Sequence, residues 1–283
     1  MTESLYTIGE VAELTGINPV TLRAWQRRYG LLQPQRTPKG HRLYGDADVA
    51  RIRQILLWLE LGVSIGQVKG LLGQPATAPA TGGDHWQDWQ TRLDQALQGL
   101  APTRLAAALG ELLASYPFAL CRRQVLEPWL TAMAQWTRPD AAALQAFALQ
   151  WLSLYLGRRL VEPAKGRPLA LAGWGTLPPL SLIFAGLELQ QYGFAPTLLP
   201  EVTPAQARLL QPRLAAPWLV WVGTGLSMAQ RGEAWPEGTA LLGDLLSLYP
   251  ANSWSAPQFN CLADWLAAEG LSGQEGSDAT GLV

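Results

Sequence analysis

The stretch from Asn18 to Tyr44 constrains the fold of this chain most, because it carries a helix start, a charged helix face and a turn in direct succession. Asn18 can cap a helix by accepting a hydrogen bond from a free backbone N–H, and Pro19 suits the first helical position, where no N–H is needed. The apolar residues that follow at spacings of three and four are Leu22, Trp25 and Tyr29. This spacing predicts a helix held in place through one apolar stripe.

A second face of the predicted helix is cationic. Arg23 and Arg27 lie one turn apart, and Arg28 flanks them. Gly30 is expected to end the helix, and residues 31–44 have apolar ends around a polar centre whose Pro and Gly suit a turn between two short strands. We therefore expect a basic β-hairpin beside a basic helix.

The segment TIGEVAELTG, residues 7–16, predicts a shorter helix immediately upstream. Thr7 and Glu10 form the pattern of a capping box, and Gly16 suits the end of the helix. The residues that this pattern buries are Ile8, Val11 and Leu14. Two short helices joined at Gly16 and Ile17 indicate a helix-turn-helix, whose second helix enters the major groove of DNA.

The cationic side chains of this region are the candidate DNA contacts. Arg23 is the first choice for a base contact, because arginine can make paired hydrogen bonds to guanine O6 and N7. The remaining candidates are Arg27, Arg28, Arg36, Lys39, Arg42 and Tyr44 for the DNA backbone, His41 at the hairpin tip, and Thr21. The alternative is a merely solvated arginine face above packed aromatic residues. We adopt the packing interpretation for Trp25 and Tyr29, and DNA binding for the arginines.

Two further helices and a linker are expected after the hairpin. Residues 46–61 place apolar side chains on one stripe, and Ser64 can cap the helix that follows. Residues 73–84, GQPATAPATGGD, contain no large apolar side chain, as a solvated linker requires. The sequence therefore predicts a DNA-reading head at residues 1–73 and a flexible linker at 74–85, on which the head can reorient.

The head resembles a known family. The run TIGEVAELTGINPVTLRAWQRRYGLLQPQRTPKGHRLY, followed by DADVARIRQILLWLELGVSIGQVKGLL, is similar to the winged-helix head of MerR-type transcription regulators, and most closely to their MlrA and CarA/CarH branch. The shared features are a Trp-x-Arg-Arg-Tyr-Gly core and a Gly-His-Arg-Leu wing. The resemblance places Arg23 and Arg27 on the recognition helix, and it places Arg36, His41, Arg42 and Tyr44 in the wing. It also implies activation of promoters such as those for curli-type extracellular matrix.

The charge of the chain is divided unequally. Its net charge is -1, but residues 1–73 carry nine Lys or Arg against six acidic residues, a net of +3. The remaining residues carry twelve bases and sixteen acids, a net of -4. A basic head on an acidic body concentrates the attraction for phosphate at one end of the protein.

Residues 86–163 predict a bundle of four helices. Four segments rich in Ala and Leu are separated by short breaks at Pro102, at Pro117 and at Arg138-Pro139. Pro128 lies inside the third segment, where it either kinks a helix or marks its true beginning, and the sequence does not decide between the two.

Residues 164–270 predict a Rossmann-like α/β domain. The short apolar segments PLALAG, APTLLP and WLVWVG alternate with helical segments, which indicates a doubly wound parallel sheet. TALLG and a helix from Pro257 to Glu269 are expected to complete it, and residues 271–283 are expected to be a disordered tail. The predicted fold class is therefore multidomain, α and α/β, with a winged helix-turn-helix, a helical bundle and a doubly wound sheet.

A bundle followed by a doubly wound sheet is similar to the cobalamin-binding module of CarH-like regulators. In that family, an Asp-x-His-x-x-Gly loop after the first strand supplies the histidine that binds cobalt. The corresponding loop here is residues 173–178, GWGTLP, and the two histidines of the chain are His41, in the wing, and His85, at the end of the linker. We expect His85 to be solvated. No cofactor is therefore predicted, because the axial imidazole is missing.

Other chemistry has little support in the sequence. No metal-ligand cluster, phosphate loop or nucleophile–histidine pattern is present, so we predict no enzyme. Cys121 and Cys261 lie in apolar helical contexts and are expected to be structural, and the absence of a secretory signal or an apolar run indicates a cytoplasmic protein without a membrane partner. Eleven of the thirteen tryptophans follow the linker, and we expect them, including Trp129, Trp136 and Trp151, to pack in cores.

Three functional hypotheses follow. The first is a sequence-specific transcription regulator that binds double-stranded promoter DNA as a homodimer, with RNA polymerase or a regulatory protein as a further candidate partner. The second is a sensor whose Trp-rich body binds a small molecule other than cobalamin and so controls DNA binding. The third, a corrinoid-dependent enzyme component, is disfavoured by the missing ligand.

Overall fold

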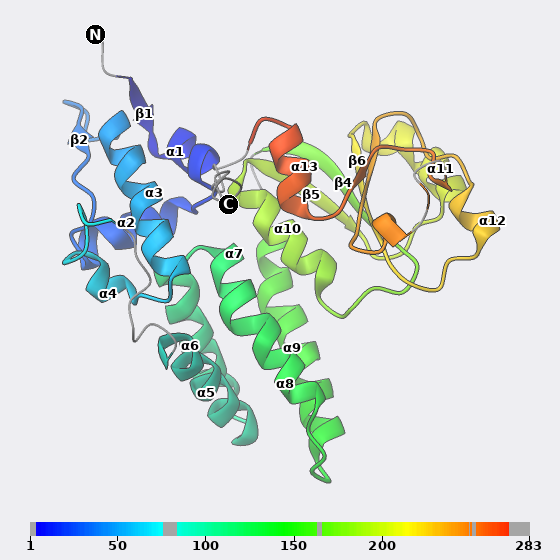
Figure 1. Cartoon of the computed structure of the whole chain (residues 1–283), viewed down its shortest axis with the longest axis horizontal. Helices are drawn as coiled ribbons and strands as arrows, with labels where there is room; N and C mark the ends of the chain where they lie inside the picture. The colour runs from blue at the N-terminus through cyan, green and yellow to red at the C-terminus, as the bar shows by residue number, and fades with distance from the viewer. Residues whose placement is uncertain (1–3, 76–83, 163–165, 249, 251–252, 272–283) are drawn as a thin grey trace, which may run out of the picture. The chain divides into compact units, whose positions relative to one another are not determined.

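The computed structural model describes residues 4–75, 84–162, 166–248, 250 and 253–271 (Figure 1). The chain divides into two compact units, Met1–Tyr155 and Leu156–Val283. The predicted tail at 271–283 lies, apart from its first residue, outside the described residues, as do residues 76–83 of the predicted linker.

The first unit begins with a helix-turn-helix and a three-stranded antiparallel sheet of order β1-β3-β2. Its elements are β1 (Leu5–Thr7), α1 (Ile8–Thr15), α2 (Pro19–Arg28), β2 (Gln35–Arg36), β3 (Arg42–Gly45), α3 (Asp46–Glu60) and α4 (Ile65–Val68). The capping box of Thr7 and Glu10 and the Asn18 cap are present as predicted. Leu14 was expected to be buried and is 40% exposed, because it lies beside rather than on the stripe of Val11 and Thr15. The strand β1 was not predicted.

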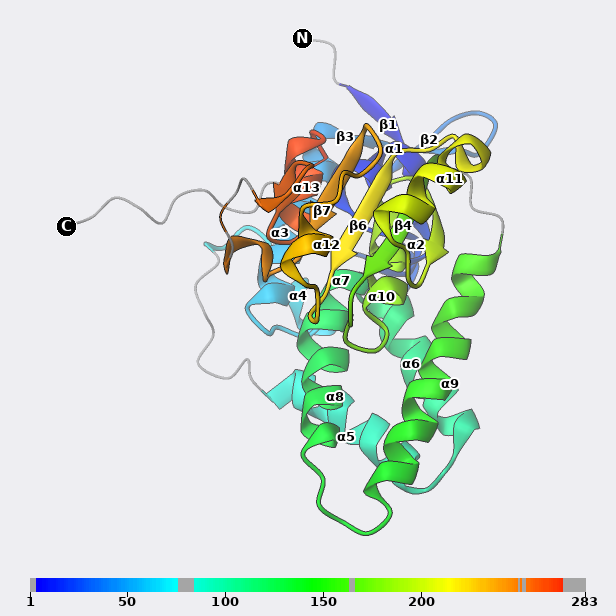
Figure 2. The same ribbon diagram turned by 90° about the vertical axis from the view of Figure 1, so that its right-hand side faces the viewer.

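The helices expected in the bundle follow in the same unit. They are α5 (Asp84–Gln98), α6 (Pro102–Ser115), α7 (Phe118–Cys121), the π-helical turn η1 (Arg122–Leu126), α8 (Glu127–Ala134) and α9 (Ala141–Val161), whose last residues belong to the second unit. Figure 2 shows α8 and α9 joined by a turn at one end of the bundle.

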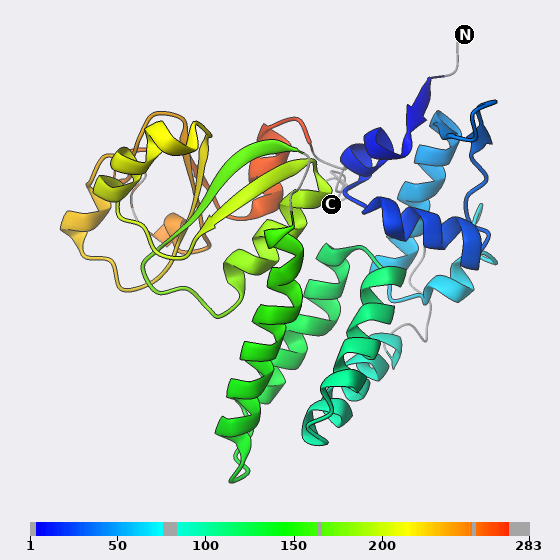
Figure 3. The ribbon, with the colours of Figure 1, turned by 180° about the vertical axis from the view of Figure 1, so that it is seen from behind.

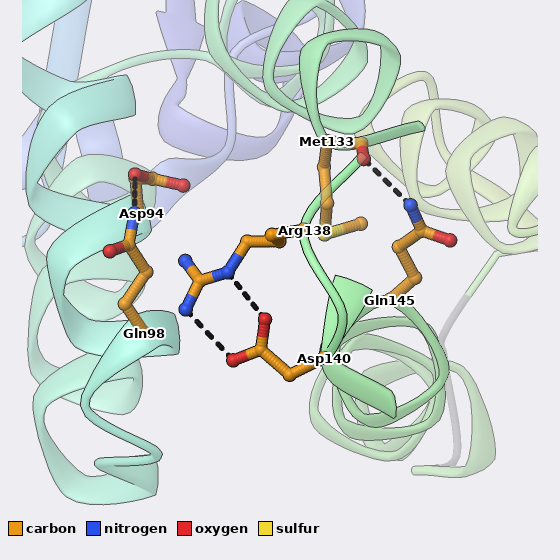
Figure 4. A network of polar contacts seen from close by, with 6 residues as sticks. All are labelled: Asp94, Gln98, Met133, Arg138, Asp140 and Gln145. Atoms are coloured by element: carbon orange, nitrogen blue, oxygen red, sulfur yellow. Dashed lines mark hydrogen bonds and ion pairs between the residues drawn. The ribbon is translucent and has the colours of Figure 1, made fainter. Parts of the chain in front are cut away.

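Polar contacts close that turn (Figure 4). The Nε and Nη2 atoms of Arg138 donate to the two oxygens of the Asp140 carboxylate, and the distance from Nη2 to Oδ2 is 2.8 Å. Gln145 Nε2 donates to the carbonyl oxygen of Met133 at 2.8 Å. The Arg138 hydrogen bonds lower the pKa of Asp140. The Met133 carbonyl, in the last turn of α8, also accepts from the backbone N–H of Trp136 at 3.1 Å, so the Gln145 bond adds a side-chain donor to it.

The head does not stand apart from the bundle. The helix α2 packs against α6, as the teal and blue helices of Figure 3 show, and the indole nitrogen of Trp25 donates to the carbonyl oxygen of Ser115 at 2.8 Å. We had expected the head to reorient on its linker. The described contacts instead attach it to α6, because the apolar stripe of α2 is wide enough to serve both the head and the bundle.

The second unit contains a five-stranded parallel sheet of order β5-β4-β6-β7-β8. Its elements are β4 (Arg167–Trp174), α10 (Ser181–Gln191), β5 (Phe194–Leu199), α11 (Pro204–Leu214), β6 (Trp218–Val222), α12 (Met228–Arg231), β7 (Thr239–Leu242), the 3-10 turn η2 (Leu246–Leu248), β8 (Gln258–Phe259) and α13 (Leu262–Ala268). One face packs on α10 and α13, and the other on α11 and a tryptophan cluster. The helix expected from Pro257 begins later, because residues 258–259 pair with β7 as an edge strand.

Candidate nucleic-acid interface

The second helix of the helix-turn-helix, α2, has one buried and one cationic face. Leu22 and Trp25 are both 0% exposed, whereas Arg23, Arg27 and Arg28 are exposed. Asn18 Oδ1 accepts from the backbone N–H of Val20 at 2.8 Å, which orients the start of the helix. The helix is thus held from behind and carries its guanidinium groups toward solvent, as a helix that enters a groove requires.

The hairpin of β2 and β3 forms the wing beside this helix. Its tip is closed by hydrogen bonds from Thr37 N to His41 O at 2.9 Å and from Gly40 N to Thr37 O at 2.8 Å. Gly40 has φ +82°, a conformation that glycine adopts without strain. Arg36, Lys39 and His41 are exposed on this hairpin, which gives the wing three side chains able to donate to phosphates.

Arg42 has a different environment from the other candidates. It is partly buried, and its Nε donates to Gln26 Oε1 at 2.7 Å. This bond joins the wing to α2, so Arg42 fixes the spacing of these two elements. Gln26 was not among the predicted residues, because a pair formed between a helix and a strand sixteen residues apart leaves no periodic signal in the sequence.

Two residues that we predicted to contact DNA, Thr21 and Tyr44, are buried. Thr21 is 1% exposed and Tyr44 is 0% exposed, so neither side chain reaches the surface that DNA would touch. Burial raises the pKa of Tyr44, opposed in part by the nearby charges of Arg42 and Arg23. Tyr44 therefore supports the wing from inside the head. Thr21 faces the same interior, one helical turn before Trp25.

The exposed cationic groups are not neutralised by neighbouring acids. Among the described residues, none of the ion pairs involves the six exposed candidates Arg23, Arg27, Arg28, Arg36, Lys39 and His41. Across all the residues that the structure describes, no group of three His, Cys, Asp or Glu side chains is placed to hold a metal ion. Exposed guanidinium and ammonium groups of this kind are suited to contact an anionic polymer.

The carboxyl ends of β4 and β6 form the topological switch point of the parallel sheet, where ligands bind in many such folds. Here the two loops pair with each other: Thr176 N donates to Thr224 O at 2.9 Å, and Thr224 N donates to Thr176 O at 3.0 Å. A Cβ on Gly223 would collide with the Thr176 carbonyl, so glycine permits this close approach. The crevice between these strand ends is occupied by backbone.

The tryptophans of the second unit pack with one another. Trp174 meets Trp235 edge to face, with ring centroids 5.2 Å apart, and it meets Trp254 at 6.2 Å. Trp129 of the bundle is buried as expected, whereas Trp136 and Trp151 are only partly buried. The cluster in the second unit is a packed core.

Two side chains, His85 and Cys261, differ from their expected environments. His85 is half-buried rather than solvated, with Nε2 2.6 Å from the Tyr116 hydroxyl, and burial lowers its pKa. Cys121 is buried as expected, but Cys261 is exposed at the start of α13.

No helix in the described ranges is both long and apolar enough to cross a membrane.

A helix-turn-helix whose second helix is cationic, tied to a basic wing, defines a winged-helix DNA-binding protein. Residues 6–74 match the family model described as "MerR HTH family regulatory protein". The chain is 37% identical over 240 residues to the HTH-type transcriptional regulator MlrA of Escherichia coli, covering 83% of this chain and 96% of that protein. The chain belongs to the MerR family of transcription regulators and is an MlrA-like member.

Of two further relatives, one is similar over most of the chain and the other over a stretch the length of the head. The HTH-type transcriptional repressor CarH of Myxococcus xanthus is 31% identical over 223 residues, which cover 73% of this chain and 74% of that protein. The HTH-type transcriptional activator TipA of Streptomyces coelicolor is 43% identical over 75 residues, only 26% of this chain. All three relatives are named as transcriptional regulators. Similarity beyond the head is thus shared with MlrA and CarH.

Proposed function

We propose that this regulator binds promoter DNA as a two-fold dimer, with α2 in the major groove and the wing on the flanking phosphates. The observation that carries the proposal is that Arg23 and Arg27 are exposed, with no ion pair among the described residues, on a helix whose opposite face is buried. Arg23 reads a base, while Arg27, Arg28, Arg36, Lys39 and His41 contact the backbone. Arg42 contributes by holding the wing to Gln26. A single head makes few contacts, so two half-sites are needed for tight binding.

The rest of the chain acts in regulation or dimerisation rather than in catalysis. We assign residues 86–163 to a bundle domain and residues 164–270 to an α/β domain, which we take to be cobalamin-binding-like in fold. The loop GWGTLP has no imidazole for cobalt, and the strand ends beside it are paired with each other. These features support a module that works without the cofactor. An unchanged ultraviolet-visible spectrum of cobalamin on mixing with the protein is the expected outcome, and a shifted spectrum would contradict it.

The regulated genes follow from the resemblance to MlrA-type regulators. We propose activation of promoters for extracellular matrix of the curli type. Genome-wide mapping of bound DNA, together with transcript levels in a deletion strain, tests this. Bound sites upstream of matrix genes, with lower transcripts in the deletion strain, are expected; sites confined to unrelated genes would refute the assignment of targets.

The role of Arg23 can be tested by comparing two arginines. The probe is the duplex that the parent chain enriches from a random pool, measured beside an unselected duplex. We expect Arg23→Ala to lose about 1–3 kcal/mol on the enriched duplex and to relax preference at one base pair. Arg36→Ala, on the exposed wing, is the matched control and should weaken both duplexes similarly.

Equal losses of Arg23→Ala on the enriched and the unselected duplex would show that Arg23 contacts only the DNA backbone. Thermal unfolding of both variants should match that of the parent chain, because both side chains are exposed. The comparison therefore measures recognition rather than folding.

A further inference from the structure

The carboxyl end of α6 is attached to the buried side of the DNA-reading helix. Ser115 is the last residue of α6, and the carbonyl groups of a last helical turn have no partner within the helix. Trp25 Nε1 supplies the donor for the Ser115 carbonyl at 2.8 Å, and the Tyr29 hydroxyl lies 3.4 Å from Ser115 Oγ. The helix that carries Arg23 and Arg27 is thus joined to the bundle by directed polar contacts as well as by packing.

The next residue, Tyr116, makes a second connection to the head. Its side chain is 2% exposed, and its hydroxyl accepts from the backbone N–H of Ile65 at 3.3 Å. Ile65 begins α4, and the N–H groups of a first helical turn also lack partners within their helix. The same hydroxyl lies 2.6 Å from His85 Nε2 on α5. One hydroxyl therefore links α4, α5 and α6.

The contact between Trp25 and Ser115 is not a general property of buried tryptophans in this chain. Trp58, in the same head on α3, is 3% exposed, and its Nε1 has no hydrogen-bond partner in the described part of the chain. A paired indole N–H restricts the orientation of its ring, whereas packing alone tolerates small rotations. The geometry of α2 against α6 is therefore specified by Trp25.

We propose that Ser115 and Tyr116 are positioning residues for DNA recognition: Ser115 holds α2 and Tyr116 holds α4, and together they keep the reading head in the orientation that presents Arg23 to a base edge. The inference rests on the proposed role of α2 and adds a function for the bundle, namely that α6 sets the angle of the reading head. Base contacts depend on that angle, while long arginine and lysine side chains can follow phosphates after a small rotation. Loosening this joint lowers sequence preference more than it lowers general affinity.

The test uses the full chain and two matched substitutions. Trp25→Phe keeps a buried ring but removes the donor to Ser115, and Trp58→Phe removes an indole N–H that has no partner. The affinity ratio between the enriched duplex and an unselected duplex is measured for each. We expect Trp25→Phe to lower the ratio about three- to tenfold, the factor that one net hydrogen bond represents. The salt dependence of DNA binding by Trp25→Phe should equal that of the parent chain. Trp58→Phe should leave the affinity ratio unchanged.

A second variant protects the test against misfolding. Tyr116→Phe removes the acceptor for Ile65 while keeping the ring, and it should lower the ratio in the same direction as Trp25→Phe. Thermal unfolding is followed in parallel, and affinities are compared well below the melting temperature. A ratio like the parent's in both Trp25→Phe and Tyr116→Phe would overturn the proposal, and so would an equal fall in Trp58→Phe.

Failure of this inference is distinguishable from failure of the proposed function. If Arg23→Ala lowers the ratio but the Trp25 and Tyr116 variants do not, α2 reads DNA without needing the joint with α6. If Arg23→Ala also leaves the ratio unchanged, Arg23 contacts only the DNA backbone, and the proposed function fails at the residue on which this inference rests.

Discussion

Residues on α2 divide by helical spacing into those that reach solvent and those that do not. Thr21 lies four residues before Trp25, so the two share one face of the helix, and both are buried. That spacing was present in the sequence and would have removed Thr21 from the DNA contacts. Arg23 and Arg27 share another face and are exposed. At this scale, side-chain periodicity separates support from recognition.

His85 gives a prediction of pH dependence. Burial lowers its pKa from an ordinary value of 6.5, and the charge of Asp88 opposes the shift. Below about pH 6.5 the unfolded chain therefore binds a proton that the folded chain resists, so folding stability falls as the pH falls toward the lowered pKa. We expect the melting temperature of the parent chain to drop between about pH 7 and about pH 5 by more than that of His85→Gln.

His41→Gln is the control for this experiment, because His41 is the other histidine of the chain and lies exposed on the wing. It should reproduce the pH profile of the parent. A His85→Gln profile that falls as steeply as the parent's would assign the acid sensitivity to other groups.

The third helical segment of the bundle shows how an element accommodates proline. Pro128 has no N–H to donate to the Gln124 carbonyl, which would be its partner in an α-helix. The chain passes through the π-helical turn η1 just before it, and Gln90 Nε2 of α5 donates to Gln124 O at 2.8 Å. Pro128 therefore lies in the first turn of α8, where its missing N–H costs little, and marks the beginning of that helix, while a neighbouring helix supplies a donor for the Gln124 carbonyl.

Gln90 should accordingly stabilise the bundle. We expect Gln90→Ala to lower the free energy of unfolding by about 1–2 kcal/mol, because a partly buried carbonyl loses its partner. Gln98→Ala is the control on the same helix, since Gln98 bonds only to nearby Asp94 and is exposed. Urea unfolding followed by circular dichroism measures both. A Gln90→Ala midpoint equal to that of Gln98→Ala would contradict the role of Gln90.

The whole molecule carries its charge asymmetrically, with +3 on residues 1–73 and -4 on the remainder. If a dimer neutralises about 6 to 8 phosphates, the logarithm of its affinity should fall against the logarithm of salt concentration with a slope of roughly -5 to -7. Binding titrations over a range of potassium chloride concentrations measure this slope. A slope near half that value would indicate that one head engages the DNA.

Sedimentation of the protein alone and with the enriched duplex checks the same prediction independently. Two protein chains per duplex are expected, as a two-fold protein on two half-sites requires. One chain per duplex at saturating protein would contradict the dimer.

The sequence by itself determined the elements whose signals are local. The caps at Thr7 and Asn18, the cationic face of α2 and the alternation of strands and helices after residue 166 were all predictable, because each depends on residues within a few positions of one another. The family resemblance of the head was readable for the same reason. Short strands such as β1 and β8 were missed, since two or three residues carry little periodicity.

Only the tertiary structure decided how these elements are joined. The bonds from Arg42 to Gln26, from Trp25 to Ser115 and from Gln90 to Gln124 connect residues between 16 and 90 positions apart. Such pairs depend on where whole elements come to rest, and no local pattern records them. The burial of Tyr44 and His85 was hidden for the same reason: exposure is a property of neighbours in space. The residues able to touch DNA could thus be proposed from the sequence, but the contacts that hold them in place required the fold.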